Sequence, residues 1–226
     1  MYVDKSYEGN KIIQPIYGKS AEKISQEELE CMRACYAGEV SLCDTWFGYF
    51  IEQLKNLNLY EESLIILISD HGHNLGERGC VGKVPQHMYP ELVDIPFMIK
   101  PPGNLEGPVR VQKSYVYNHD ILPTILGFIG KDVPEFLDGE DLSILVDDPE
   151  RELEGRDHIT CGMSLWTLYK DDKYAFITKN DQTEQQLYHL PKDLTWRDNI
   201  AEENQDLCAQ LFEKINIDAN GDLLIN

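Results

Sequence analysis

Apolar residues recur at three- and four-residue steps between about residues 29 and 54, which is the spacing of one face of an α-helix. Ser25 and Glu28 precede this pattern with the S-x-x-E spacing of a capping box, so we expect the helix to begin there. A different pattern follows at 63–69, where the central residues are apolar without alternation. Such a run is typical of a β-strand that is covered on both faces.

The pattern after this strand predicts a long glycine-rich loop over 72–90 and a second buried strand over 94–100. A short helix is expected after Asp120, whose side chain can cap it, with Pro123 in its first turn. A strand, a long loop, a strand and a helix in this order favour an α/β sheet.

The character of the chain changes near residue 158. Short segments with aromatic residues, separated by polar turns, predict an antiparallel sheet, and a last helix is expected over about 200–216. We therefore predict two domains. Residues 1–150 form an α/β domain, and residues 151–226 form a small antiparallel sheet with a terminal helix. The acidic stretch 146–157 separates them.

Composition narrows the classes of partner. Forty acidic against twenty basic residues give a formal net charge of −20, which argues against nucleic acid, because neutralising phosphates needs clustered lysine and arginine. The charge serves solubility, or the acids gather around a cation. The six cysteines form no C-x-x-C pair and are expected to be reduced. No segment reaches the roughly 18 apolar residues of a membrane span, and no signal peptide is recognised, so we expect a soluble, cytoplasmic chain.

Asp70 and His71 form the first candidate site, since they follow directly on the strand at 63–69. Ligands of open α/β sheets collect outside the carboxyl ends of strands. A carboxylate beside a neutral imidazole suits a divalent cation. The alternative is structural, with Asp70 capping a turn and His71 lying in an ordinary loop. Two ligands are too few for a tight metal site, so others must come from elsewhere.

Lys83 is the second candidate, in a loop that also holds Gly79 and Gly82. Its ammonium group could contact an anionic group of a substrate as a compact charge. The alternative is a solvated surface lysine. His73 and His87 flank the same loop, and each taken alone is more often a surface histidine.

Five segments in the same order resemble the sulfatases, within the alkaline phosphatase superfamily, over about residues 36–215. They are the helix and strand ending in S-D-H-G, the segment "YPELVDIPFMIKPPG" after G-K, "NHDILPTILGFIG", "VPEFLDGEDLSILV", and the closing "QQLYHLPKDLTWRDNIAEE". The resemblance implies part of an alkaline-phosphatase-like mixed sheet with flanking helices.

The resemblance also implies roles for individual residues. Asp70 would be a metal-bound carboxylate and His71 the neighbouring ligand. Lys83 would contact an oxygen of a sulfate or phosphate ester, and we assign His87 to substrate binding beside it. The divalent ion would be Ca²⁺ by family usage, with Mn²⁺ or Mg²⁺ as alternatives. Asp94 stands where the family has arginine two residues before the strand proline, which leaves the charge pattern there in doubt.

Two family motifs are absent from this sequence: the C/S-x-P-x-R nucleophile motif, converted to formylglycine in sulfatases, and a paired D-D metal motif that follows an N-terminal strand. The chain therefore resembles the C-terminal half of a sulfatase, and three readings follow. It is a portion that is inactive alone; or it works with a second polypeptide, or by self-association, through a large exposed apolar surface; or it is a non-enzymatic binding protein. The "LGERG" segment favours sulfate esters, with phosphodiester or phosphonate monoester hydrolysis as the alternative.

Overall fold

The computed structural model of the chain describes residues 2–9, 24–103, 107, 114–148 and 150–225. It divides into two compact units, Met1–Asn104 and Leu105–Asn226. The predicted domains, 1–150 and 151–226, divide the chain at a different place and stay a prediction.

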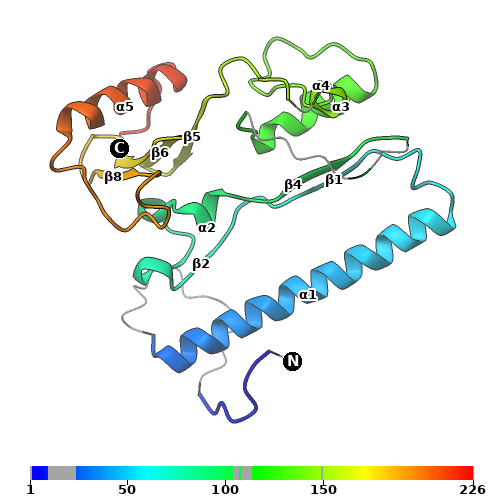
Figure 1. Cartoon of the computed structure of the whole chain (residues 1–226), viewed down its shortest axis with the longest axis horizontal. Helices are drawn as coiled ribbons and strands as arrows, with labels where there is room; N and C mark the ends of the chain where they lie inside the picture. Colours follow the sequence, from blue (N-terminus) through cyan, green and yellow to red (C-terminus); the bar gives the residue numbers. More distant parts are fainter. Residues whose placement is uncertain (1, 10–23, 104–106, 108–113, 149, 226) are drawn as a thin grey trace. The chain divides into compact units, whose positions relative to one another are not determined.

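The first unit begins with the predicted long helix, α1 (Gln26–Asn56) (Figure 1). Its capping box is complete, because the Ser25 hydroxyl accepts from the Glu28 amide at 3.2 Å and the Glu28 carboxylate accepts from the Ser25 amide at 2.9 Å. Cys31 and Met32 are buried, near the start of the helix. Large apolar side chains further along it are exposed: Tyr36, Val40, Leu42, Trp46, Tyr49 and Phe50.

Both strands predicted for this unit are confirmed. β1 (Ile65–Ile68) and β4 (Phe97–Lys100) pair antiparallel, with Ile65 opposite Lys100 and Ile68 opposite Phe97. All four residues of β1 are half-buried. The expected cover on both faces is therefore only partial among the residues that the structure describes.

The segment between these strands is more ordered than a glycine-rich loop. β2 (Asn74–Leu75) and β3 (Val81–Gly82) form a short antiparallel hairpin. Its connection contains the 3₁₀ turn η2 (Glu77–Gly79), and η3 (Pro85–His87) and α2 (Pro90–Val93) lead on to β4. Short elements of this kind carry too few residues for a period to be read from the sequence.

The second unit contains the predicted short helix, α3 (Ile121–Phe128), after the 3₁₀ turn η4 (Asn118–Asp120), and later α4 (Ile144–Asp147). The expected cap is wrong, because the Asp120 side chain makes no capping bond to α3. The carboxylate is fully buried and accepts from the Tyr117 and Glu140 amides at 2.7 and 2.8 Å. It also pairs with both terminal nitrogens of Arg156, at 2.8 and 3.2 Å.

The small antiparallel sheet and its helix are confirmed in this unit. The strands β5 (His158–Met163), β6 (Trp166–Asp171), β7 (Tyr174–Lys179) and β8 (Gln186–His189) pair in chain order. α5 (Gln205–Asp218) packs its apolar side on the sheet. The shared core consists of Tyr169, Phe176, Leu187, Ala201, Cys208, Leu211 and Ile215.

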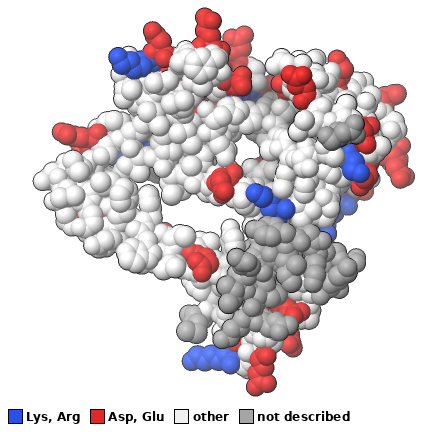
Figure 2. Space-filling view, turned by 180° about the vertical axis from the view of Figure 1, so that it is seen from behind, with Lys and Arg blue, Asp and Glu red and all other residues white. Residues whose placement is uncertain are grey.

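Charge and cysteines follow the sequence expectations. On the face drawn in Figure 2, acidic side chains outnumber basic ones, in line with the net charge of −20. All six cysteines are free. Of the helices in the described residues, none combines the length and the apolar character needed to cross a bilayer.

Candidate functional site

Asp70 and His71 follow the end of β1 and place a carboxylate beside an imidazole. The Asp70 side chain is 85% exposed, and its Oδ2 lies 3.5 Å from Nε2 of His71. The Nδ1 of His71 lies 2.7 Å from the Gly72 carbonyl oxygen, which can only accept, so Nδ1 carries the proton. In the neutral ring, Nε2 therefore holds the lone pair. A proton on Nε2 or a bound cation would relieve the repulsion between this lone pair and the carboxylate oxygen.

This donor set fits part of a divalent metal site. Carboxylate oxygen suits hard cations, and imidazole nitrogen widens the range of ions. A carbonyl that holds the opposite ring nitrogen is the usual support of a metal-binding histidine. In the residues that the structure describes, no three His, Cys, Asp or Glu side chains gather closely enough to hold a metal ion. Two donors are too few for a tight metal site, and the role of Asp70 and His71 as metal ligands stays a prediction.

Gly72 fixes the direction of the chain after this pair. Its amide donates to the Leu92 carbonyl at 2.8 Å, and the His73 amide donates to the Glu91 carbonyl at 2.8 Å. A Cβ atom at position 72 would lie 2.0 Å from the Glu91 oxygen. Glycine is therefore required here because two segments of the main chain are in contact. This contact gives a physical reason for the glycine of S-D-H-G.

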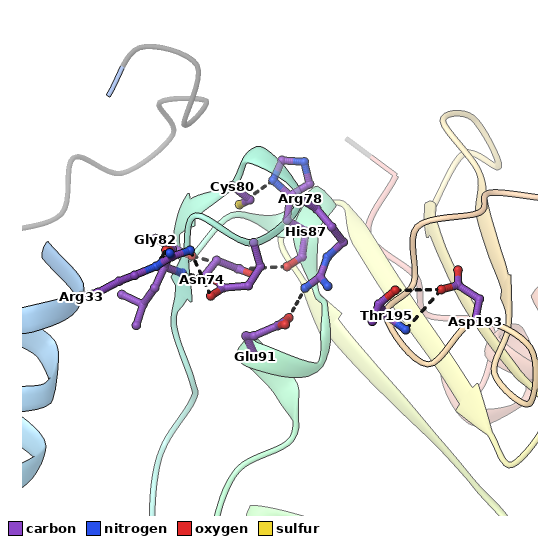
Figure 3. A network of polar contacts seen from close by, with 11 residues as sticks. Arg33, Asn74, Arg78, Cys80, Gly82, His87, Glu91, Asp193 and Thr195 are labelled. Carbon is purple, nitrogen blue, oxygen red and sulfur yellow. Dashed lines mark hydrogen bonds and ion pairs between the residues drawn. The ribbon is translucent and has the colours of Figure 1, made fainter. Parts of the chain in front are cut away.

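Asn74 connects this segment to the loop that carries Lys83 and His87. Its side chain is fully buried, and its Nδ2 donates to the Gly82 carbonyl at 3.1 Å and to the His87 carbonyl at 3.2 Å (Figure 3). Our sequence reasoning missed this residue. The available signal was the asparagine itself, which stands between S-D-H-G-H and an apolar residue. A strand at this position would favour a β-branched residue.

Lys83 follows β3 directly and is half-buried. Its position beside the hairpin is fixed by the pairing of Asn74 with Gly82. Among the described residues, no hydrogen bond or ion pair joins Lys83 or His87 to Asp70 or His71. The structure thus places both predicted substrate groups on the neighbouring hairpin and its following turn, and their assigned roles stay predictions.

His87 is held at its backbone and at its ring. Its Nδ1 lies 2.7 Å from the Cys80 sulfur, and the ring stacks on Tyr89 with 5.4 Å between centroids. Burial lowers the pKa of His87, and the neighbouring Arg78 guanidinium lowers it further. Burial raises the pKa of the Cys80 thiol to about 11. Both groups are therefore neutral near pH 7. From the sequence, Cys80 was expected only to be one of six reduced cysteines.

Three further side-chain contacts stabilise this part of the first unit. Arg78 forms an ion pair with Glu91 and lies over the Tyr89 ring, 4.1 Å from its centroid (Figure 3). His73 stacks on Tyr36 of α1 with 6.3 Å between centroids, and burial lowers its pKa, with His71 adding to the shift. His73 therefore belongs to the packing of the unit rather than to its surface.

Comparisons with known proteins match this chain to a family and to several relatives. The family model described as Sulfatase matches residues 5–131, more than half of the chain. An ulvan-active sulfatase of Formosa agariphila is 29% identical over 153 residues, which cover 68% of this chain and 29% of that protein. The multifunctional alkaline phosphatase superfamily protein PehA of Trinickia caryophylli is 30% identical over 123 residues, covering 54% of this chain and 24% of that protein.

A solved structure gives the same fold. The phosphonate monoester hydrolase of Silicibacter pomeroyi aligns with a TM-score of 0.76 at 20% identity, over 89% of this chain and 43% of that one. This likeness confirms the predicted alkaline-phosphatase-like α/β fold with its small antiparallel sheet. The chain spans between 24% and 43% of the length of these relatives.

Proposed function

Because this chain belongs to the sulfatase family, we propose that it forms the cation- and anion-binding part of a hydrolase of sulfate esters. The observation that carries the proposal is the pair at the end of β1. His71 keeps its proton on Nδ1, which leaves the lone pair of Nε2 available to a metal ion, 3.5 Å from the Asp70 carboxylate. A divalent ion would be held by these two atoms together with donors from outside the described residues.

The roles of the groups follow from their chemistry. A divalent ion held by Asp70 and His71, Ca²⁺ by family usage and otherwise Mn²⁺ or Mg²⁺, would supply Lewis-acid polarisation of an ester and stabilisation of negative charge. The Lys83 ammonium group supplies a point charge for an ester oxygen. His87, which is neutral, supplies a hydrogen bond rather than a charge. These groups bind and orient an anion, and none of them is the nucleophile.

The nucleophile comes from residues outside this sequence, since no C/S-x-P-x-R segment occurs in it. The exposed side of α1 supports this part of the proposal. At about 100° per residue, its exposed apolar side chains from position 36 to position 50 cover about half of the circumference of the helix. In an amphipathic helix with one face in solvent, the apolar stripe usually covers a smaller part of the circumference. The surface fits packing against a further part of a sulfatase fold, either in the same polypeptide or in another.

Metal binding tests the proposal directly. Calorimetric titration with Ca²⁺ and with Mn²⁺ is expected to give binding that Asp70→Ala and His71→Ala each abolish. The matched control is Glu62→Ala, which removes an exposed carboxylate before the other end of β1. Equal binding by the Asp70 variant and the control would refute the assigned site. Failure of the unaltered chain to bind either ion would mean that the two donors bind no metal without the donors that come from elsewhere.

Turnover and self-association are measured on the same protein. We expect no hydrolysis of 4-nitrophenyl sulfate above background, because the covalent step has no nucleophile here. Light scattering gives the molar mass in solution and so reports whether two copies associate, as the exposed apolar side of α1 would allow. Turnover that depends on Asp70 and on protein concentration would show instead that a dimer completes the site.

Phosphonate or phosphodiester hydrolysis is the second candidate. One observation favours it: the Asp70–His71 pair, which resembles the variant in such hydrolases. Titration with 4-nitrophenyl sulfate and with a phenylphosphonate monoester, each with metal present, distinguishes the two. We expect tighter binding of the sulfate ester, weakened by Lys83→Ala and unaffected by Lys5→Ala, an exposed lysine of the same unit. The reverse order of affinity would favour the phosphonate.

A further inference from the structure

The contact between Cys80 and His87 has a consequence for the proposed anion site. Cys80 is 1% exposed, and its sulfur lies 2.7 Å from Nδ1 of His87. One of the two atoms must supply the proton that they share. A thiol is a weak donor and its sulfur a weak acceptor, whereas an imidazole nitrogen with a lone pair is a good acceptor. With both groups neutral, the arrangement in which the thiol donates to Nδ1 is the better bond.

The surroundings hold the imidazole in this orientation. The His87 carbonyl accepts from Asn74, and its amide donates to the Val84 carbonyl at 3.0 Å. The ring lies nearly parallel to that of Tyr89, with 16° between the planes. The ring therefore has little freedom to exchange the positions of its two nitrogens.

We propose that Cys80 is a positioning residue, whose thiol donates to Nδ1 of His87 and so places the ring proton on Nε2, where it can donate to an oxygen of an anionic ester. A neutral N–H donor binds a sulfate ester without adding a second cation beside Lys83. The inference deepens the proposed function and rests on it for the identity of the ligand. The assignment of the proton itself does not depend on any ligand.

The test is the tautomer of His87 in the ligand-free chain, read from the ¹⁵N chemical shifts of its two ring nitrogens. We expect the proton on Nε2 in the unaltered protein and in Cys80→Ser, which keeps a hydroxyl donor. In Cys80→Ala the ratio of the Nε2–H to the Nδ1–H form is expected to fall about fivefold, which corresponds to the net value of about 1 kcal/mol for one hydrogen bond.

The matched control is Cys31→Ala, which removes another buried thiol of the same unit. Its His87 ratio should equal that of the unaltered chain. A proton on Nδ1 in the unaltered protein would overturn the inference, and so would an unchanged ratio in a folded Cys80→Ala variant. Because no ester is present, a failure of ester binding bears on the proposed function alone.

Discussion

Asn74 is expected to hold the hairpin that carries Lys83 and His87, and replacing it with alanine tests this. The change removes two hydrogen bonds, from Nδ2 to the Gly82 and His87 carbonyls. At a net value of about 1 kcal/mol each, the loss is about 2 kcal/mol of local stability. Little is lost with Oδ1, which is buried without a hydrogen-bond partner among the described residues.

Hydrogen exchange measured by mass spectrometry on peptides covering residues 74–87 reports the local opening of this segment. A loss of about 2 kcal/mol corresponds to exchange that is about 30-fold faster. Asn74→Asp is the informative companion, because it keeps the shape and replaces the donor with an acceptor that faces two carbonyl oxygens. It should open the hairpin more readily than alanine does. Unchanged exchange in Asn74→Ala, or better protection in Asn74→Asp than in Asn74→Ala, would refute the anchoring role.

Three further predictions concern the second unit. Arg156→Ala leaves its buried carboxylate partner unpaired and should lower the free energy of unfolding by about 3–5 kcal/mol in urea denaturation, and a loss below 1 kcal/mol would contradict this. Gly127→Ala should lower the melting temperature, because the new Cβ would lie 2.0 Å from Asp141 Oδ2; an unchanged value would show that the carboxylate moves without cost. The hydrogen bond with His158 holds the Asp157 pKa below its ordinary value, so its stabilisation is present above the unfolded-state pKa and is lost as the pH falls through the folded-state pKa. Asp157→Asn should therefore reduce stability at pH 7 by a small amount that disappears in acid, and a difference that persists in acid would refute the linkage.

The elements that the sequence predicted well are those with a long pattern or a terminal signal. The start of α1 was found because Ser25 and Glu28 form a capping box, and β1 because its apolar run ends at Ser69-Asp70. The hairpin of β2 and β3 was missed, because strands of two residues have no period. It includes hydrogen bonds from a side chain, Asn74, to residues 8 and 13 positions away, which no local pattern indicates.

The role of Asp120 was mistaken for a similar reason. Its position directly before a helix is typical of a capping residue. No local pattern indicates that its carboxylate pairs with a distant arginine instead. Arg156 lies 36 residues further along the chain. The same limit applies to the candidate site. The sequence indicated Asp70 and His71 as neighbours, but it could not indicate that Cys80 meets His87, because this contact depends on how the turn after β3 folds back.

The anchoring by Asn74 separates the fold of this hairpin from the chemistry that it presents. Its side chain bonds main-chain carbonyls, which every amino acid possesses, so the anchor does not depend on which side chain stands at position 87. A mutation that replaces the imidazole changes what the turn offers to a ligand and leaves these two bonds in place. The side chain at position 87 can therefore change in evolution while the scaffold beneath it stays the same, so under the proposed function this turn is a place where substrate preference can diverge.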